Sequence, residues 1–121
     1  MQSSDILSGI EMNPAELIAE IRATYERHGW HLRGALLRSQ TRALLSDASH
    51  DLPEVAVRDS DFDALWFARA SNVNREAWEL RLLAQTPYAL FETFEPEETE
   101  AERDEVKQEM EARMREYASR S

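Results

Sequence analysis

The sequence contains no cysteine, and only three glycines and four prolines occur among its 121 residues. Without cysteine, the chain can form no disulfide, and it has no thiolate to act as a nucleophile or as a metal ligand. The glycines, Gly9, Gly29 and Gly34, do not make the closely spaced motif that cradles a phosphate group. The chain is long enough to bury a single core without covalent staples. We therefore expect one domain in a reducing compartment, the cytoplasm.

The sequence also lacks a long apolar run and a basic segment followed by an apolar core near its start. We expect neither a membrane span nor a secretory leader. Basic residues are in the minority, because the formal net charge is −10. Eight acids against Arg103 leave a net charge of −7 between Glu92 and Glu105. This charge disfavours nucleic acid and anionic membrane surfaces as partners.

Three apolar runs between residues 64 and 94 predict an antiparallel meander of three strands. In the middle run, Trp78, Leu80 and Leu82 share one parity, and Glu79 and Arg81 share the other. This two-residue period is typical of a strand with one buried face. The last run, residues 87–94, also fits a short helix, but Pro96 follows closely and favours the strand.

Helices are predicted on both sides of this meander. Residues 1–12 show no sustained period and are expected to form a flexible tail, with a single domain over residues 13–121. Asn13 and Pro14 match a helix start, and Gly29 matches its end. Thr99 and Glu102 form a capping-box pattern at the start of a C-terminal helix. Its narrow apolar stripe is expected to face either the sheet or a second copy of itself: Val106, Met110, Met114 and Tyr117.

The remaining segments are less regular. Residues 30–38 predict a further strand, in which Trp30, Leu32 and Leu36 share one parity and Gly34 marks a bulge or a close approach. Residues 40–46 predict a short helix and residues 46–53 a loop, and Val55 and Val57 predict a brief extended piece. The order of these helices and strands predicts a two-layer α+β domain, in which the N- and C-terminal helices pack on one face of an antiparallel sheet of about four strands.

No pattern of catalytic or metal-binding residues is complete. Asp59, Asp61 and Asp63 alternate as in a calcium loop, but Ala64 and Ala70 stand where that loop needs glycine and glutamate. His28 and His31 are separated by the predicted helix end. Ser49, His50 and Asp51 are the three residue types of a hydrolase triad, but they are adjacent, whereas the members of such triads come from distant positions in the sequence. We therefore expect no catalytic, cofactor-binding or metal site and no enzyme activity, and the three tryptophans are expected in the core.

One surface remains as a hypothesis. If the tryptophans point inward, the opposite face of the sheet combines apolar side chains with arginines, a composition typical of protein interfaces. The candidate interface consists of Arg33, Leu65, Phe67, Arg69, Glu79, Arg81 and Leu83. The alternative is that a long loop or the first helix covers this face.

These features predict an acidic, non-enzymatic interaction module that forms a homodimer or docks a protein partner through that face. The alternative function is a small-molecule binder in which Arg33, Arg69 and Arg81 hold an anionic ligand.

Overall fold

The computed structural model describes residues 13–45, 56–71, 74–84 and 86–120 of the chain. The helices and strands follow in this order: α2 (Pro14–Arg27), β1 (His31–Leu37), α3 (Ser39–Leu44), β2 (Ala56–Asp59), β3 (Ala64–Ala70), β4 (Glu76–Leu82), β5 (Ala89–Phe94) and α4 (Glu100–Arg120). The predicted tail over residues 1–12, the predicted loop at 46–53 and Val55 lie outside the described residues.

The strands form one five-stranded sheet in the order β2-β1-β3-β4-β5. Strands β3, β4 and β5 are the predicted antiparallel meander, and residues 89–94 are a strand rather than a helix. Asn74 takes a φ of 64° in the β3–β4 connection, a conformation that asparagine tolerates well. The fifth strand, β2, contains Val57 and pairs in parallel with β1, so the sheet is mixed. This pairing follows from the crossover through α3.

Local signals set the helix ends as expected. The Asn13 side chain accepts a hydrogen bond from the Glu16 amide at 2.8 Å, and Gly29 has a φ of 86° just after α2. At the start of α4, the Thr99 amide donates to Glu102 at 2.8 Å and the Glu102 amide donates to Thr99 Oγ1 at 3.1 Å. These are the two bonds of a capping box.

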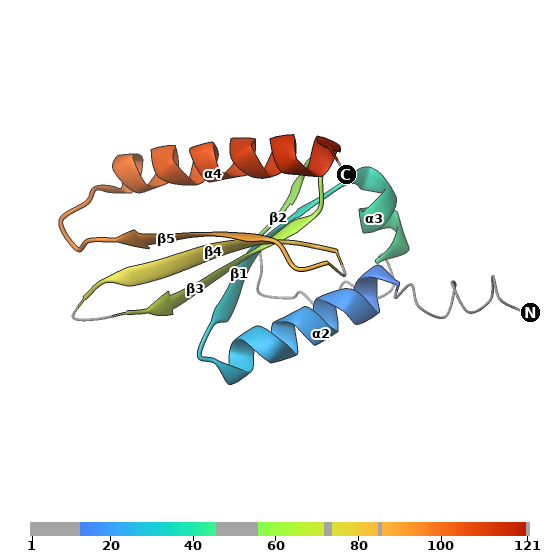
Figure 1. Ribbon diagram of the computed structural model, residues 1–121, viewed down its shortest axis with the longest axis horizontal. Coiled ribbons are helices and arrows are strands. Elements are labelled where there is room, and N and C mark those ends of the chain that lie inside the picture. Colours follow the sequence, from blue (N-terminus) through green and yellow to red (C-terminus); the bar gives the residue numbers. More distant parts are fainter. Residues whose placement is uncertain (1–12, 46–55, 72–73, 85, 121) are drawn as a thin grey trace, which may run out of the picture.

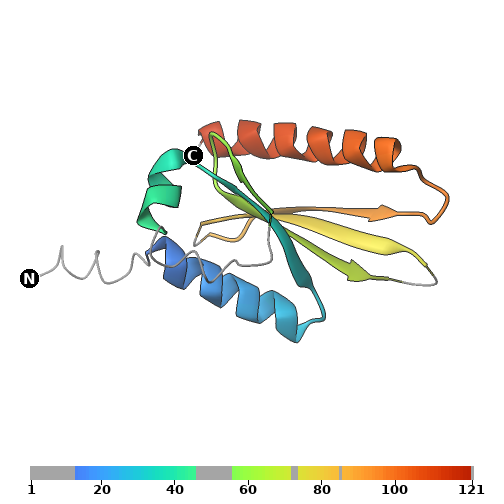
Figure 2. The same ribbon diagram turned by 180° about the vertical axis from the view of Figure 1, so that it is seen from behind.

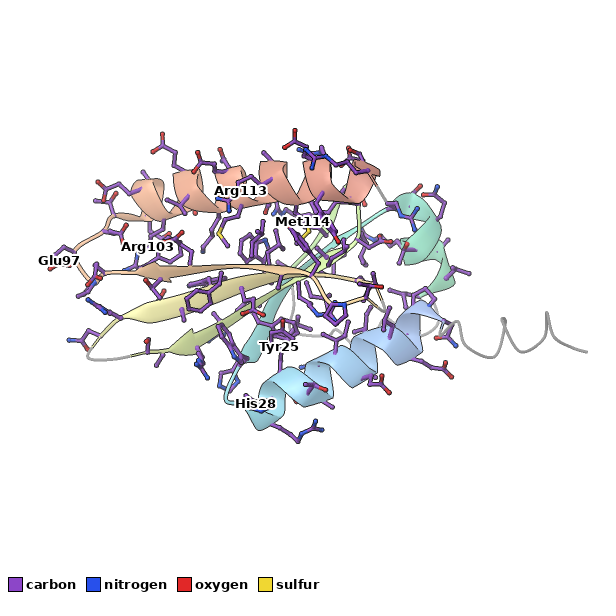
Figure 3. All side chains as sticks on the ribbon, viewed as in Figure 1. Tyr25, His28, Glu97, Arg103, Arg113 and Met114 are labelled. Carbon is purple, nitrogen blue, oxygen red and sulfur yellow. The ribbon has the colours of Figure 1, made fainter. Side chains whose placement is uncertain are left out.

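The two long helices lie on opposite faces of the sheet, which corrects the predicted two-layer arrangement (Figure 1). The view from behind shows the same three layers, with α3 at one end of the sheet (Figure 2). In Figure 3, Tyr25 of α2 and Met114 of α4 point toward the sheet from its two sides. The apolar stripe of α4 therefore packs on the sheet, with Met110 and Met114 buried.

The physical reason lies in β3. Its residues Ala64, Leu65, Trp66, Phe67 and Ala68 are all buried, so neither face of this strand is left to water. An unbroken apolar run is the pattern of a strand covered on both sides. One cluster joins Leu65 and Phe67 to α2, and a second joins Trp66 to α4.

Candidate functional site

The predicted interface is not an exposed face. Leu65 and Phe67 are 0% exposed and lie in the cluster that α2 covers. Tyr25 stacks on Phe67 with 4.1 Å between the ring centroids and 13° between the ring planes. Leu83 is partly buried against the same cluster. The first helix covers this face, as the alternative interpretation of the sequence allowed.

The polar residues of the predicted interface are engaged in holding α2 and the loops. Glu79 accepts a hydrogen bond from the Tyr25 hydroxyl, and burial together with this carboxylate raises the pKa of Tyr25. Arg69 donates to the His28 carbonyl at 2.8 Å and lies over the Trp30 ring. Arg81 donates to the carbonyls of Leu82 and Ala84. A cavity of about 560 Å³ beside α2 is lined by Tyr25 and Arg81, whose polar groups already have these partners.

Arg33 lies elsewhere, because β1 contains a bulge. Leu32 pairs with Phe67 and Gly34 pairs with Trp66, which leaves Arg33 as the extra residue between them. After the bulge the parity of the strand changes. Leu32 therefore belongs to the α2 cluster and Leu36 to the α4 cluster, although the sequence placed both on one face. The same bulge takes Arg33 away from Arg69 and Arg81 and brings it to a second pocket.

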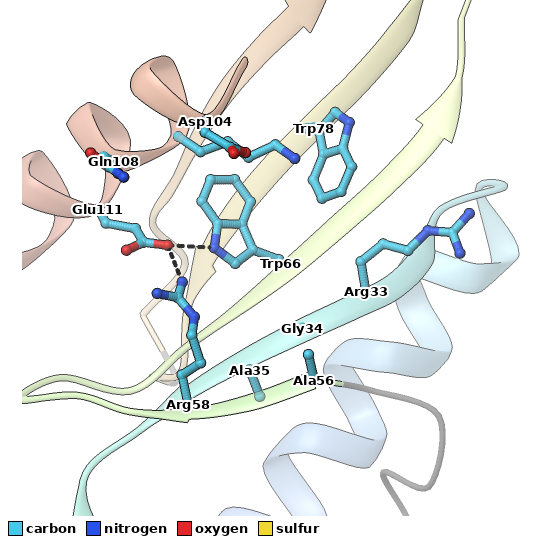
Figure 4. Close-up of a pocket in the computed structure, with 11 residues that line it drawn as sticks. Arg33, Gly34, Ala35, Ala56, Arg58, Trp66, Trp78, Asp104, Gln108 and Glu111 are labelled. Atoms are coloured by element: carbon cyan, nitrogen blue, oxygen red, sulfur yellow. Dashed lines mark hydrogen bonds and ion pairs between the residues drawn. The ribbon is translucent and has the colours of Figure 1, made fainter. Parts of the chain in front are cut away.

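This pocket, here called the α4 pocket, has a volume of about 300 Å³ and lies between α4 and strands β1–β4 (Figure 4). Small residues at positions 34, 35 and 56 line one side, and two tryptophans with part of α4 line the rest. The full lining is Arg33, Gly34, Ala35, Ala56, Arg58, Trp66, Trp78, Asp104, Lys107, Gln108 and Glu111. A Cβ on Gly34 would lie 3.4 Å from the Ala56 carbonyl oxygen and 3.8 Å from Trp66. The glycine thus keeps space open beside the indole.

Glu111 organises one wall of the α4 pocket. Its carboxylate accepts a hydrogen bond from Trp66 Nε1 at 3.0 Å and also pairs with Arg58 (Figure 4). Trp66 is buried, so this acceptor satisfies an indole N–H that would otherwise be costly to bury. Trp78 meets Trp66 edge to face, with 5.9 Å between the centroids. Trp78 is only partly buried, which corrects its expected place in the core.

Two cations of the α4 pocket, Arg33 and Lys107, form no salt bridge with any described residue. Lys107 Nζ lies 3.5 Å from the centroid of the Trp78 ring. Partial burial lowers the pKa of Lys107, and the nearby acids, Asp104 first, oppose this shift. Within the described ranges, the side chains of Arg33 and Gln108 make no hydrogen bond or ion pair. The lining has three cations, Arg33, Arg58 and Lys107, against two acids, so its formal charge is +1 on a protein of net charge −10.

The sequence pointed to Arg33 but missed the other pocket residues, because the lining comes from five separate elements. One available signal was Lys107, the single lysine of the chain, which follows the acid-rich start of α4.

The predicted metal and triad candidates are dispersed or structural. Asp61 binds Arg115, and this guanidinium lowers the pKa of the carboxyl. Asp63 accepts hydrogen bonds from the Arg38 amide and the Thr41 hydroxyl, both at 2.7 Å, and so ties the start of α3 to the residue that precedes β3. The Ser49-His50-Asp51 segment lies outside the described residues. Among the residues that are described, no three His, Asp or Glu side chains are grouped so as to hold a metal ion. In that same part of the chain, no helix has the length and apolar character to cross a bilayer.

Comparison with protein-family models, with curated proteins and with solved structures finds no match for this chain.

Proposed function

We propose that this protein binds a small planar organic anion in the α4 pocket. One observation carries the proposal: Arg33 and Lys107 lie beside Trp66 and Trp78 and form no salt bridge with any residue that the structure describes. Ligand sites combine apolar or aromatic walls with a few polar groups that fix orientation. A pocket volume of about 300 Å³ is at the lower end of the range found for small-molecule sites, so the ligand should be small.

The chemistry of the lining selects an anion. The Lys107 ammonium is partly removed from water and lies over the Trp78 ring, while the nearby acids, Asp104 first, form no salt bridge with it among the described residues. An anionic ligand group placed beside it would replace the lost hydration with a charge-assisted hydrogen bond. The planar part of the ligand would lie against the indoles, where ring stacking favours flat molecules.

Binding is proposed rather than catalysis, because the lining includes no serine, threonine or histidine that would set a nucleophile beside a base. Of the three arginines predicted to hold an anion, Arg33 lines the α4 pocket. Arg69 and Arg81 lie on the α2 face of the sheet, where they bind backbone carbonyls. The absence of cysteine supports a cytoplasmic location as part of the same proposal.

The test is thermal unfolding with benzoate, salicylate and indole-3-carboxylate, each compared with its neutral amide. A ligand at about 100 times its Kd stabilises the folded state by roughly 2.7 kcal/mol, so binding appears as a rise in Tm. We expect a carboxylate to raise the Tm more than its amide, and Lys107→Met to remove the difference. Arg75→Ala is the matched control, because Arg75 lies in the β3–β4 connection, outside the α4 pocket, and its side chain pairs with Glu95. Equal shifts from carboxylates and amides, or none, would overturn the proposal.

A further inference from the structure

The last strand of the meander presents a free edge. In the order β2-β1-β3-β4-β5, β5 ends the sheet, and no described residue pairs with its outer side. Sheet edges invite pairing with another strand, and proteins usually block them with proline, lysine or a bulge. Residues Ala89–Phe94 contain neither proline nor lysine, and their register with β4 is regular.

Hydrogen-bond alternation identifies which backbone groups face outward. The Leu82 amide donates to the Tyr88 carbonyl at 2.9 Å, so this pair is hydrogen-bonded, and every second pair along β4 and β5 is too. Leu90, Glu92 and Phe94 therefore direct their N–H and C=O groups at β4. Ala89, Phe91 and Thr93 direct theirs away from the sheet.

The side chains of this edge differ between the two faces. Phe91 lies on the α2 face and is 56% exposed, with its ring 6.1 Å from Trp30. Glu92 lies on the α4 face and has no ion pair among the described residues. It begins the run of fourteen residues that carries a net charge of −7.

This charge decides which strand fits the edge. A second copy would bring another net charge of −10 and set Glu92 close to its own counterpart. An extended basic segment would meet opposite charge instead, and charge complementarity both steers association and selects partners. We propose that β5 binds an extended, basic segment of a partner protein, which adds to the sheet as a sixth strand antiparallel to β5.

The geometry specifies the sequence of that segment. In an antiparallel pair, directly opposite residues share a face. The partner residues opposite Ala89, Phe91 and Thr93 exchange backbone hydrogen bonds with them and lie on the α2 face, where an apolar side chain covers Phe91. The residues between them lie on the α4 face, where lysine or arginine meets Glu92. The expected segment alternates apolar and basic residues.

The probe is the fluorescent peptide acetyl-Lys-Val-Arg-Val-Lys-Val-Arg-amide, measured by anisotropy against the full chain. Two further peptides carry backbone N-methyl groups, one on the valines and the other on the internal basic residues. We expect N-methylation of the valines to weaken binding by about tenfold or more, because their N–H groups pair with β5. N-methylation of the basic residues should leave the affinity within about threefold, since those N–H groups face solvent. Equal affinity of all three peptides, or no binding, would contradict the proposal.

Protein variants test the same edge. Thr93→Pro removes an outward N–H without touching the bonds to β4 and should weaken binding about tenfold. Glu92→Gln should weaken peptide binding more than the control Glu97→Gln does. Both variants remove one negative charge, but Glu97 lies in the β5–α4 turn and points away from the sheet (Figure 3). Light scattering on the protein without peptide measures whether β5 pairs with a second copy instead. A dimer that Thr93→Pro dissociates, with no peptide binding, would assign the edge to a second copy and overturn the proposal.

Discussion

Two phenylalanines of the same sheet provide a test of where α2 lies. Phe67 of β3 is 0% exposed and stacks on Tyr25, whereas Phe91 of β5 is 56% exposed. Truncating a fully buried phenylalanine to alanine costs roughly 3 to 5 kcal/mol through lost burial and the cavity left behind. Less than half of the Phe91 side chain is buried, so Phe91→Ala should cost only about 1 to 2 kcal/mol.

The assay is urea unfolding followed by tryptophan fluorescence at low protein concentration. Domains of this size have an unfolding free energy of roughly 5 to 15 kcal/mol, so Phe67→Ala removes a large share of it. With a urea m value of about 1 to 3 kcal/mol per molar, the midpoint of Phe67→Ala should fall about 1 to 2 M below that of Phe91→Ala. The m value should stay the same for both variants.

The opposite result would arise if α2 did not cover this face. Phe67 would then be as accessible as Phe91, and the two substitutions would shift the midpoint equally. Such a result would falsify the three-layer arrangement and restore the face of Leu65 and Phe67 as an exposed surface.

Three further expectations follow from individual contacts. Glu111→Gln should cost about 1 kcal/mol less than Glu111→Leu by urea unfolding, because the amide still accepts the Trp66 N–H. The folded state raises the pKa of Tyr25, so the neutral hydroxyl contributes its full share to the unfolding free energy below pH 10. That contribution falls as the pH rises above 10, by at most about 1.4 kcal/mol per pH unit. Wild type should therefore lose more stability than Tyr25→Phe between about pH 9 and pH 11, and equal losses would contradict this assignment. Millimolar calcium should leave the Tm unchanged, because Asp61 is bound to Arg115; a saturable rise that Asp61→Asn abolishes would refute this expectation.

Much of the fold could be predicted from the sequence, because the signals involved are local. The caps at Asn13 and Thr99 satisfy backbone groups within three residues of themselves, and they set the helix starts wherever the helices dock. The two-residue period of Trp78, Leu80 and Leu82 depends only on strand geometry, and it correctly predicted β4.

Tertiary structure alone decided which face each helix covers and where the candidate site lies. The apolar run Ala64–Ala68 shows that both faces of β3 need cover, but no local signal tells which helix covers which face. The bulge at Arg33 depends on the pairing of β1 with β3, and a single extra residue changes the side on which every later residue lies. That change separates Arg33 from Arg69 and Arg81 and places it with Lys107 of α4. Periodicity within one strand carries no information about pairing with another, so the α4 pocket exists only once the strands and α4 have come together.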